Sequence, residues 1–281
     1  MQSSTILLMS CKGELPHLDA AIFADTGWER NETYMHLEWL RQEAGRHGIE
    51  VITVNDGDIR ELKIIQGIKG KRRASMPFFT DNNGKTIGML KRQCTYDYKI
   101  TPIKRQIRKM LGLKPRQWAP KDCVEQWLGF STDEAQRIFT RGPERMSVLC
   151  YPLLQWNPMS RHDCEKWLYE NYHITVPKSA CIGCPYHHQN EWRALNEMEF
   201  KEATEFDEMI RRKGGVRGDL YLHRSCMPLH EVDFRTAEER GQYVFDFIKD
   251  EKLNLFANEI SILDDFGLRA LISPQPEGRE G

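Results

Sequence analysis

The cysteines are the residues of this chain with the clearest capacity for chemistry. There are eight in 281 residues, and two of them form Cys181-x-x-Cys184, followed by Pro185. Two thiolates at this spacing in a loop can hold one metal ion or one edge of a cluster, but either site needs further ligands. The pair therefore predicts a metal or cluster site, with unligated thiols as the alternative.

Composition narrows the class of protein. Cysteine makes up about 3% of the chain, far below the density of a disulfide scaffold. No apolar run reaches the length of a membrane span, and Ile6–Met9 is too short for a signal sequence. These patterns predict a cytoplasmic protein with no membrane partner, in which cysteines serve metals, clusters or catalysis. Cys11, Cys123, Cys150 and Cys226 lie among neighbours typical of core or surface positions, and they remain unassigned.

Basic residues are concentrated in two stretches, although the formal net charge is only −1. One stretch is residues 69–73; the other, residues 91–116, holds nine Lys or Arg and one acidic residue, Asp97. This imbalance predicts a positive face that neutralises ATP, a phosphosulfate or the backbone of tRNA or DNA. We expect the tryptophans to belong to the core or its cover rather than to stack on bases: Trp118, Trp127, Trp156, Trp167 and Trp192.

Strand and helix signals alternate in the first half of the chain. Residues 18–24 and 49–54 are apolar runs typical of buried parallel strands, and residues 32–47 between them carry a helical apolar face. This βαβ order predicts an α/β fold with a parallel sheet. The turn Asp25-Thr26-Gly27 falls at the carboxyl end of a strand, where such sheets bind ligands.

Further elements follow along the chain. We expect a hairpin from residues 77–80 and 86–90 around Asn82-Asn83-Gly84, a basic helix at 102–111, a strand at 123–130, and helices at 160–169, 190–212 and 236–248. The predicted organisation is a nucleotide-binding half (1–150), a mostly helical, cysteine-bearing half packed on it (151–273), and a tail (274–281).

Four segments, standing in order, resemble the phosphoadenosine phosphosulfate reductase-like family of PP-loop ATP pyrophosphatases. They are Phe23-Ala24-Asp25-Thr26-Gly27-Trp28-Glu29, Arg92-Gln93-Cys94-Thr95 with Lys99-Ile100-x-Pro102, Gly129-x-Ser131-x-x-Glu134-Ala135-x-Arg137, and Cys181-Ile182-Gly183-Cys184-Pro185. The resemblance implies a parallel-sheet, HUP-like nucleotide fold that binds ATP with Mg²⁺.

The phosphate-binding loop of this family follows its first strand, and its backbone N–H groups cradle the phosphates. In this sequence only Gln2, Ser3 and Ser4 correspond to the end of that loop, so the first strand and the glycines are missing; the alternative is a simple helix start. Asp25, Thr26 and Gly27 would lie beside the adenosine, or else form a helix-entry turn. Arg92 would also contact the nucleotide. Arg137 would meet a phosphate or sulfate, or else pair with Asp133 or Glu134.

Cys94 corresponds to the upstream cysteine of the cluster-containing family members, which use four cysteines for a [4Fe–4S] cluster. The second cysteine of an upstream pair is absent here, and Cys164 is the best substitute. We therefore expect cluster ligands at Cys94, Cys164, Cys181 and Cys184, with zinc bound by His187 or His188 as the alternative.

The resemblance implies ATP-dependent adenylation followed by displacement of AMP by a sulfur species, with Cys94 and Arg137 as catalytic residues and a sulfur donor protein as partner. Nucleic acid is a candidate substrate. Two alternatives remain open. A phosphosulfate reductase would need a C-terminal reactive cysteine, and Cys226-Met227-Pro228-Leu229-His230 does not resemble the family's Glu-Cys-Gly-Leu-His tail. The other alternative is a partner subunit that binds nucleotide or nucleic acid without catalysis.

Overall fold

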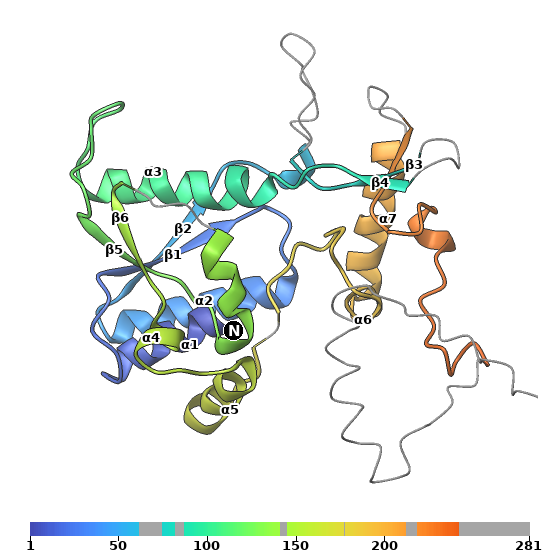
Figure 1. The fold of residues 1–281 in the computed structure, drawn as a ribbon. Coiled ribbons are helices and arrows are strands. Elements are labelled where there is room, and N and C mark those ends of the chain that lie inside the picture. Colours follow the sequence, from blue (N-terminus) through green and yellow to red (C-terminus); the bar gives the residue numbers. More distant parts are fainter. Residues whose placement is uncertain (62–74, 82–86, 141–144, 177, 212–217, 242–281) are drawn as a thin grey trace, which may run out of the picture. The chain divides into compact units, whose positions relative to one another are not determined.

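The computed structural model describes residues 1–61, 75–81, 87–140, 145–176, 178–211 and 218–241 (Figure 1). The chain divides into two compact units, Met1–Val232 and Asp233–Gly281. The first unit is a mixed α/β structure with small parallel sheets, as the sequence predicts at this level. The tail at 274–281 lies outside the described residues. Among the described residues, no helix combines the length and apolar character that crossing a membrane requires.

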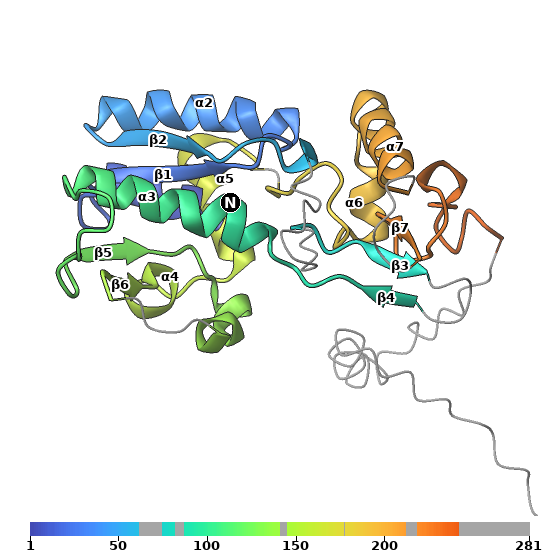
Figure 2. The same ribbon diagram turned by 90° about the horizontal axis from the view of Figure 1, so that it is seen from above.

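The first parallel pair consists of β1 (Ala20–Asp25) and β2 (Glu50–Asn55), joined by helix α2 (Asn31–Arg46). Figure 2 shows α2 lying along this pair. The helix buries Leu37, Leu40 and Ala44 in the same core cluster as Ile49 and Val51. The predicted βαβ unit is therefore confirmed, because the apolar face of the helix has the neighbouring strands to pack on.

A second parallel pair consists of β5 (Val124–Trp127) and β6 (Ser147–Cys150), followed by the short helix α4 (Pro152–Gln155). Helix α5 (Arg161–Tyr172) begins with a capping box in which Ser160 and Asp163 exchange hydrogen bonds. Helix α1 (Gln2–Cys11) packs against α2, α4 and α5. Helix α3 (Thr101–Met110) contacts β1 and β2, and a π-helical turn, η3 (Thr95–Ile100), leads into it.

An antiparallel sheet forms the remaining strand layer, in the order β4 (Ile87–Met89), β3 (Phe79–Asp81), β7 (Asp219–Tyr221). Strands β3 and β4 confirm the predicted hairpin, although its turn, Asn82–Gly84, lies outside the described residues. Helix α7 (Glu197–Arg211) contacts β7, and the buried carboxylate of Asp207 accepts hydrogen bonds from the backbone N–H groups of Leu222 and Leu229.

The single helix predicted at 190–212 is wrong in one respect. The structure has two helices, α6 (Gln189–Arg193) and α7, separated at residues 194–196. Asn196 and Glu199 exchange side-chain-to-backbone hydrogen bonds at this break, so Asn196 starts a new helix. The capping box predicted at Thr236 and Glu239 is present, while residues 242–248 of the helix expected there lie outside the described residues.

Candidate functional site

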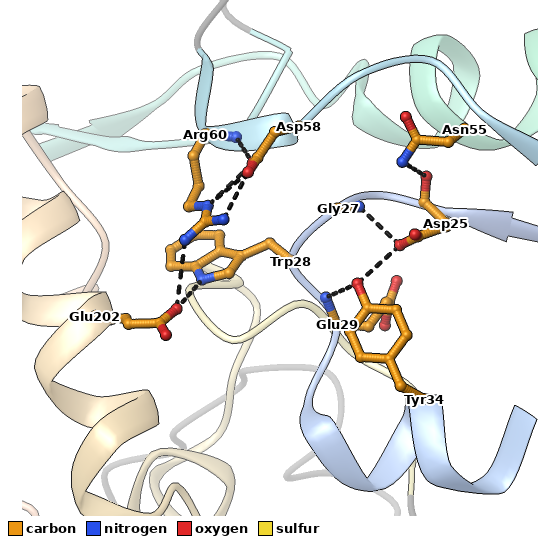
Figure 3. Close-up of polar contacts among 9 residues, drawn as sticks. All are labelled: Asp25, Gly27, Trp28, Glu29, Tyr34, Asn55, Asp58, Arg60 and Glu202. Carbon is orange, nitrogen blue, oxygen red and sulfur yellow. Dashed lines mark hydrogen bonds and ion pairs between the residues drawn. The ribbon is translucent and has the colours of Figure 1, made fainter. Parts of the chain in front are cut away.

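The turn after β1 is held by its own side chains (Figure 3). One carboxylate oxygen of Asp25 accepts hydrogen bonds from the Gly27 N–H at 2.8 Å and from the Tyr34 hydroxyl at 2.9 Å. Gly27 has a φ of +74°, and a Cβ on it would lie 2.9 Å from the Cα of Asp58, so only glycine fits. Asp25 and Gly27 therefore determine the shape of this turn.

A carboxylate with no solvent exposure, Glu29, lies directly behind this turn. It accepts hydrogen bonds from the Thr26 hydroxyl at 3.1 Å, the Lys99 ammonium at 3.3 Å and the Ser179 hydroxyl at 3.3 Å. Three donors from separate segments therefore compensate the burial of its charge.

The Cys181-x-x-Cys184 loop docks on the same turn. Glu29 and Cys181 form an antiparallel bridge, and the Ile182 N–H donates to the Trp28 carbonyl at 2.9 Å. The Cys181 Sγ lies 3.1 Å from the Thr26 hydroxyl oxygen. The predicted residues Thr26 and Cys181, 155 positions apart, are thus direct neighbours.

Gly183 lies against the indole ring of Trp28. A Cβ on Gly183 would approach the ring to 2.1 Å, so a side chain cannot be accommodated there without movement. Trp28 makes an edge-on contact with Phe206. It also donates a hydrogen bond to Glu202, and the guanidinium of Arg60 lies over its ring (Figure 3). Gly183, which stands between the two cysteines, therefore fixes the position of the loop against Trp28.

Two of the predicted cysteine ligands, Cys181 and Cys184, lie in this loop, and the third, Cys94, is near enough for its charge to act on Cys184. The charges of Cys94 and Arg92 act on Cys184, and those of Cys181 and Cys94 act on Lys99. Burial, reinforced by Glu29, raises the pKa of Cys181 to about 12, and burial raises the pKa of Cys184. Burial opposes the protonated form of Lys99, but Glu29 and the two cysteines outweigh it and raise its pKa. Both thiols are therefore neutral at pH 7 unless a cation is bound.

Cys164 has different surroundings. It is fully buried on α5 among Ile6, Met9, Leu15, Leu153 and Met159, and burial raises its pKa to about 11. The groups that act most on its charge are Thr5, the N-terminal ammonium, Asp163 and Asp133. Nothing in this geometry brings Cys164 to the predicted ligand set, because its helix buries it as a small apolar residue in the core.

His187 is a better-placed donor than Cys164. Its backbone N–H donates to the Cys184 carbonyl, the residue is 9% exposed, and its Nδ1 has no hydrogen-bond partner among the described residues. Burial lowers its pKa to about 4, so the imidazole is neutral and can act as a ligand. His188 is exposed and caps α6 instead. In the described parts of the chain, no three His, Cys, Asp or Glu side chains converge closely enough for a single metal ion.

The remaining predicted residues form a second group around the start of α1. The Gln2 amide donates to Ser131 and Glu134, and a Cβ on Gly129 would lie 2.7 Å from the Ser3 backbone nitrogen. Arg137 pairs with Glu134, as in the alternative interpretation. The buried Ser4 hydroxyl instead bonds to Nε2 of His36 at 2.9 Å. Gln2 and Arg137, both expected to bind phosphate, therefore share the carboxylate of Glu134 as a partner.

Part of the predicted basic face is neutralised within the structure. Lys99 pairs with Glu29, and Arg105 makes two hydrogen bonds to Asp56. The guanidinium of Arg92 lies over the Tyr186 ring at 5.3 Å. Residues 69–73 lie outside the described residues.

Two functional neighbours, Glu29 and Lys99, had no role predicted from sequence. Both stand inside the segments that carry the family resemblance, which is the only sequence signal for them. Trp28 and Gly183 stand in such segments as well, but their contact joins distant parts of the chain and was not predicted.

Comparison of the chain with family models, with curated proteins and with solved structures gives no match. The class defined by the structure is a mixed α/β protein with a cysteine-rich loop docked at the carboxyl end of a parallel strand.

Proposed function

We propose that this protein is an iron–sulfur enzyme of the PP-loop type, which adenylates its substrate with ATP and Mg²⁺ and then transfers sulfur to it. The observation that carries the proposal is the docking of the Cys181-x-x-Cys184 loop at the carboxyl end of β1, where parallel sheets bind ligands, with the charge of Cys94 acting on Cys184. A bound cluster would supply redox or sulfur chemistry at this edge.

We propose a cluster here rather than a single zinc ion. All ligands of a structural zinc lie within bonding distance of one atom, and no such convergence exists in the described residues. Each iron of a [4Fe–4S] cluster takes its own thiolate, so its ligands stand farther apart. His187 supplies the fourth donor in this proposal, in place of Cys164, since its buried Nδ1 has no other partner within the described structure.

The chain's own residues prepare the site. The ammonium of Lys99 offsets the negative charge of Glu29 and of the thiolates, which burial alone would keep protonated. Thr26 orients the Cys181 sulfur by its hydrogen bond, and the Trp28–Gly183 contact sets the height of the loop above the turn.

The cofactor is tested by anaerobic reconstitution with iron and sulfide. We expect about four irons per chain, with loss of the cluster in Cys184→Ser and Cys181→Ser. Cys123→Ser is the matched control, because Cys123 is exposed and stands just before β5, outside the cysteine loop. A colourless protein that retains one zinc ion would refute the cluster.

The reaction is tested separately by ATP–pyrophosphate exchange. Exchange above background supports adenylation. Its absence in the protein reconstituted with its cofactor would refute the enzyme assignment and leave the non-catalytic binding subunit.

A further inference from the structure

A hollow of about 680 Å³ lies beside α3 and shares no residue with the cysteine site. Its lining includes four cationic side chains and, among the described residues, no acidic one; the cations are Lys104, Arg108, Arg116 and Arg145. They come from α3, from the loop after it and from the residues just before β6. Such a concentration of one charge marks a site for a polyanion.

The side chain of Trp118 stands in this hollow with 78% of its surface exposed. The prediction that Trp118 belongs to the core or its cover is therefore wrong. The guanidinium of Arg145 lies 5.0 Å from the centre of its ring. This cation–π contact orients the indole and leaves most of the ring available for stacking.

The loop that carries Trp118 is fixed by hydrogen bonds. One nitrogen of Arg108 donates to the carbonyl groups of Lys114 and Gln117, at 3.1 and 2.7 Å. The side chain of Gln117 accepts in turn from the Lys114 N–H at 2.9 Å. The aromatic platform is thus held in place before any ligand arrives, which lowers the entropic cost of binding.

We propose that Trp118, with Lys104, Arg116 and Arg145 around it, is a binding site for single-stranded nucleic acid, in which the indole stacks on a base and the cations contact phosphates. An exposed aromatic ring among cations is the usual means of binding unpaired strands, whose base faces are open. In a duplex those faces are covered by neighbouring bases. This inference deepens the proposed function by naming its polynucleotide, and its test needs neither cluster nor catalysis.

The test is fluorescence anisotropy of a labelled single-stranded oligonucleotide, and of the same sequence as a duplex, with the full chain over a series of salt concentrations. Trp118→Ala should weaken single-strand binding by about 5- to 150-fold, the range that one stacked base supplies, whereas Trp118→Phe should keep most of it. Arg116→Ala and Arg145→Ala should each lower the slope of log K against log salt by about 0.7.

Lys166→Ala on α5 is the matched control for charge, because this exposed lysine lies outside the hollow, and its salt slope should not change. The proposal is overturned if the chain does not bind the single strand, if Trp118→Ala binds as tightly as the parent, or if the duplex binds equally well. Binding of ATP alone at Trp118, without the oligonucleotide, would also overturn it. Absence of ATP–pyrophosphate exchange would not change the measured binding of the oligonucleotide.

Discussion

Replacement of Gly183 by alanine tests whether the cysteine loop is positioned by Trp28. The added Cβ would lie 2.1 Å from one ring carbon of Trp28 and 2.4 Å from another, while ordinary contact begins at 3.4 Å. The clash therefore demands a movement of about 1.3 Å (3.4 − 2.1). Trp28 is 2% exposed and is held by Phe206 and Glu202, so the loop must move instead.

Overpacking of a buried site by one carbon costs about 1–3 kcal/mol, and the upper end applies because the neighbour is an immobile ring. We expect Gly183→Ala to lower the free energy of unfolding in urea by about 3 kcal/mol and to reduce the iron retained on reconstitution. Gly45→Ala is the control: a Cβ there meets nothing within 4 Å, and the helical position should gain about 0.5–1 kcal/mol.

A double-mutant cycle separates the clash from other effects of the substitution. Trp28→Phe removes the ring atoms that the new Cβ would meet, so Gly183→Ala should cost much less in that background than in the parent. An unchanged unfolding free energy in Gly183→Ala alone, or an equal cost in both backgrounds, would refute the reasoning.

Three further outcomes are expected. Lys99→Met leaves the charge of Glu29 buried without its cation, so it should destabilise the protein by about 3 kcal/mol at pH 7, at the low end for buried pairs because Lys99 is partly exposed. Since the pKa of Lys99 is raised, this difference should be complete below its ordinary value of 10.5 and shrink as a urea titration moves to higher pH. Burial lowers the pKa of His36 to about 4, so the parent should lose stability as pH falls from 6.5 to 4; in His36→Gln that dependence should weaken, and an unchanged slope would contradict a buried neutral imidazole. Asp207→Ala leaves two buried backbone N–H groups without an acceptor, so thermal unfolding should show a loss of at least about 2 kcal/mol, whereas a loss under 1 kcal/mol would speak against those bonds.

The elements that sequence predicted correctly are those whose signal is local. The runs at 18–24 and 49–54 were recognisable as β1 and β2 because both are short and nearly continuously apolar, and Ser160 with Asp163 marked the start of α5. The break before α7 was missed. Asn196, which caps the start of α7, stands in a segment whose pattern otherwise predicts one continuous helix.

The candidate site was predictable only in part. The cysteine pair and the turn after β1 were recognisable as chemistry-bearing segments, but their contact depends on tertiary packing that no spacing encodes. Cys164 is the opposite case, because sequence assigned it to the site and the structure places it in a core cluster. Its distance along the chain suggested a ligand, while the helix that carries it turns the thiol into the core.

The bridge between Glu29 and Cys181 has a consequence for the order in which the protein is made. The two residues are 152 positions apart, so during synthesis at about 5–20 residues per second Glu29 emerges roughly 8–30 s before its partner. Lys99 emerges 70 positions after Glu29, and before that the Thr26 hydroxyl and water are the donors within reach of the Glu29 carboxylate. The cysteine site therefore forms only after most of the first unit has been synthesised.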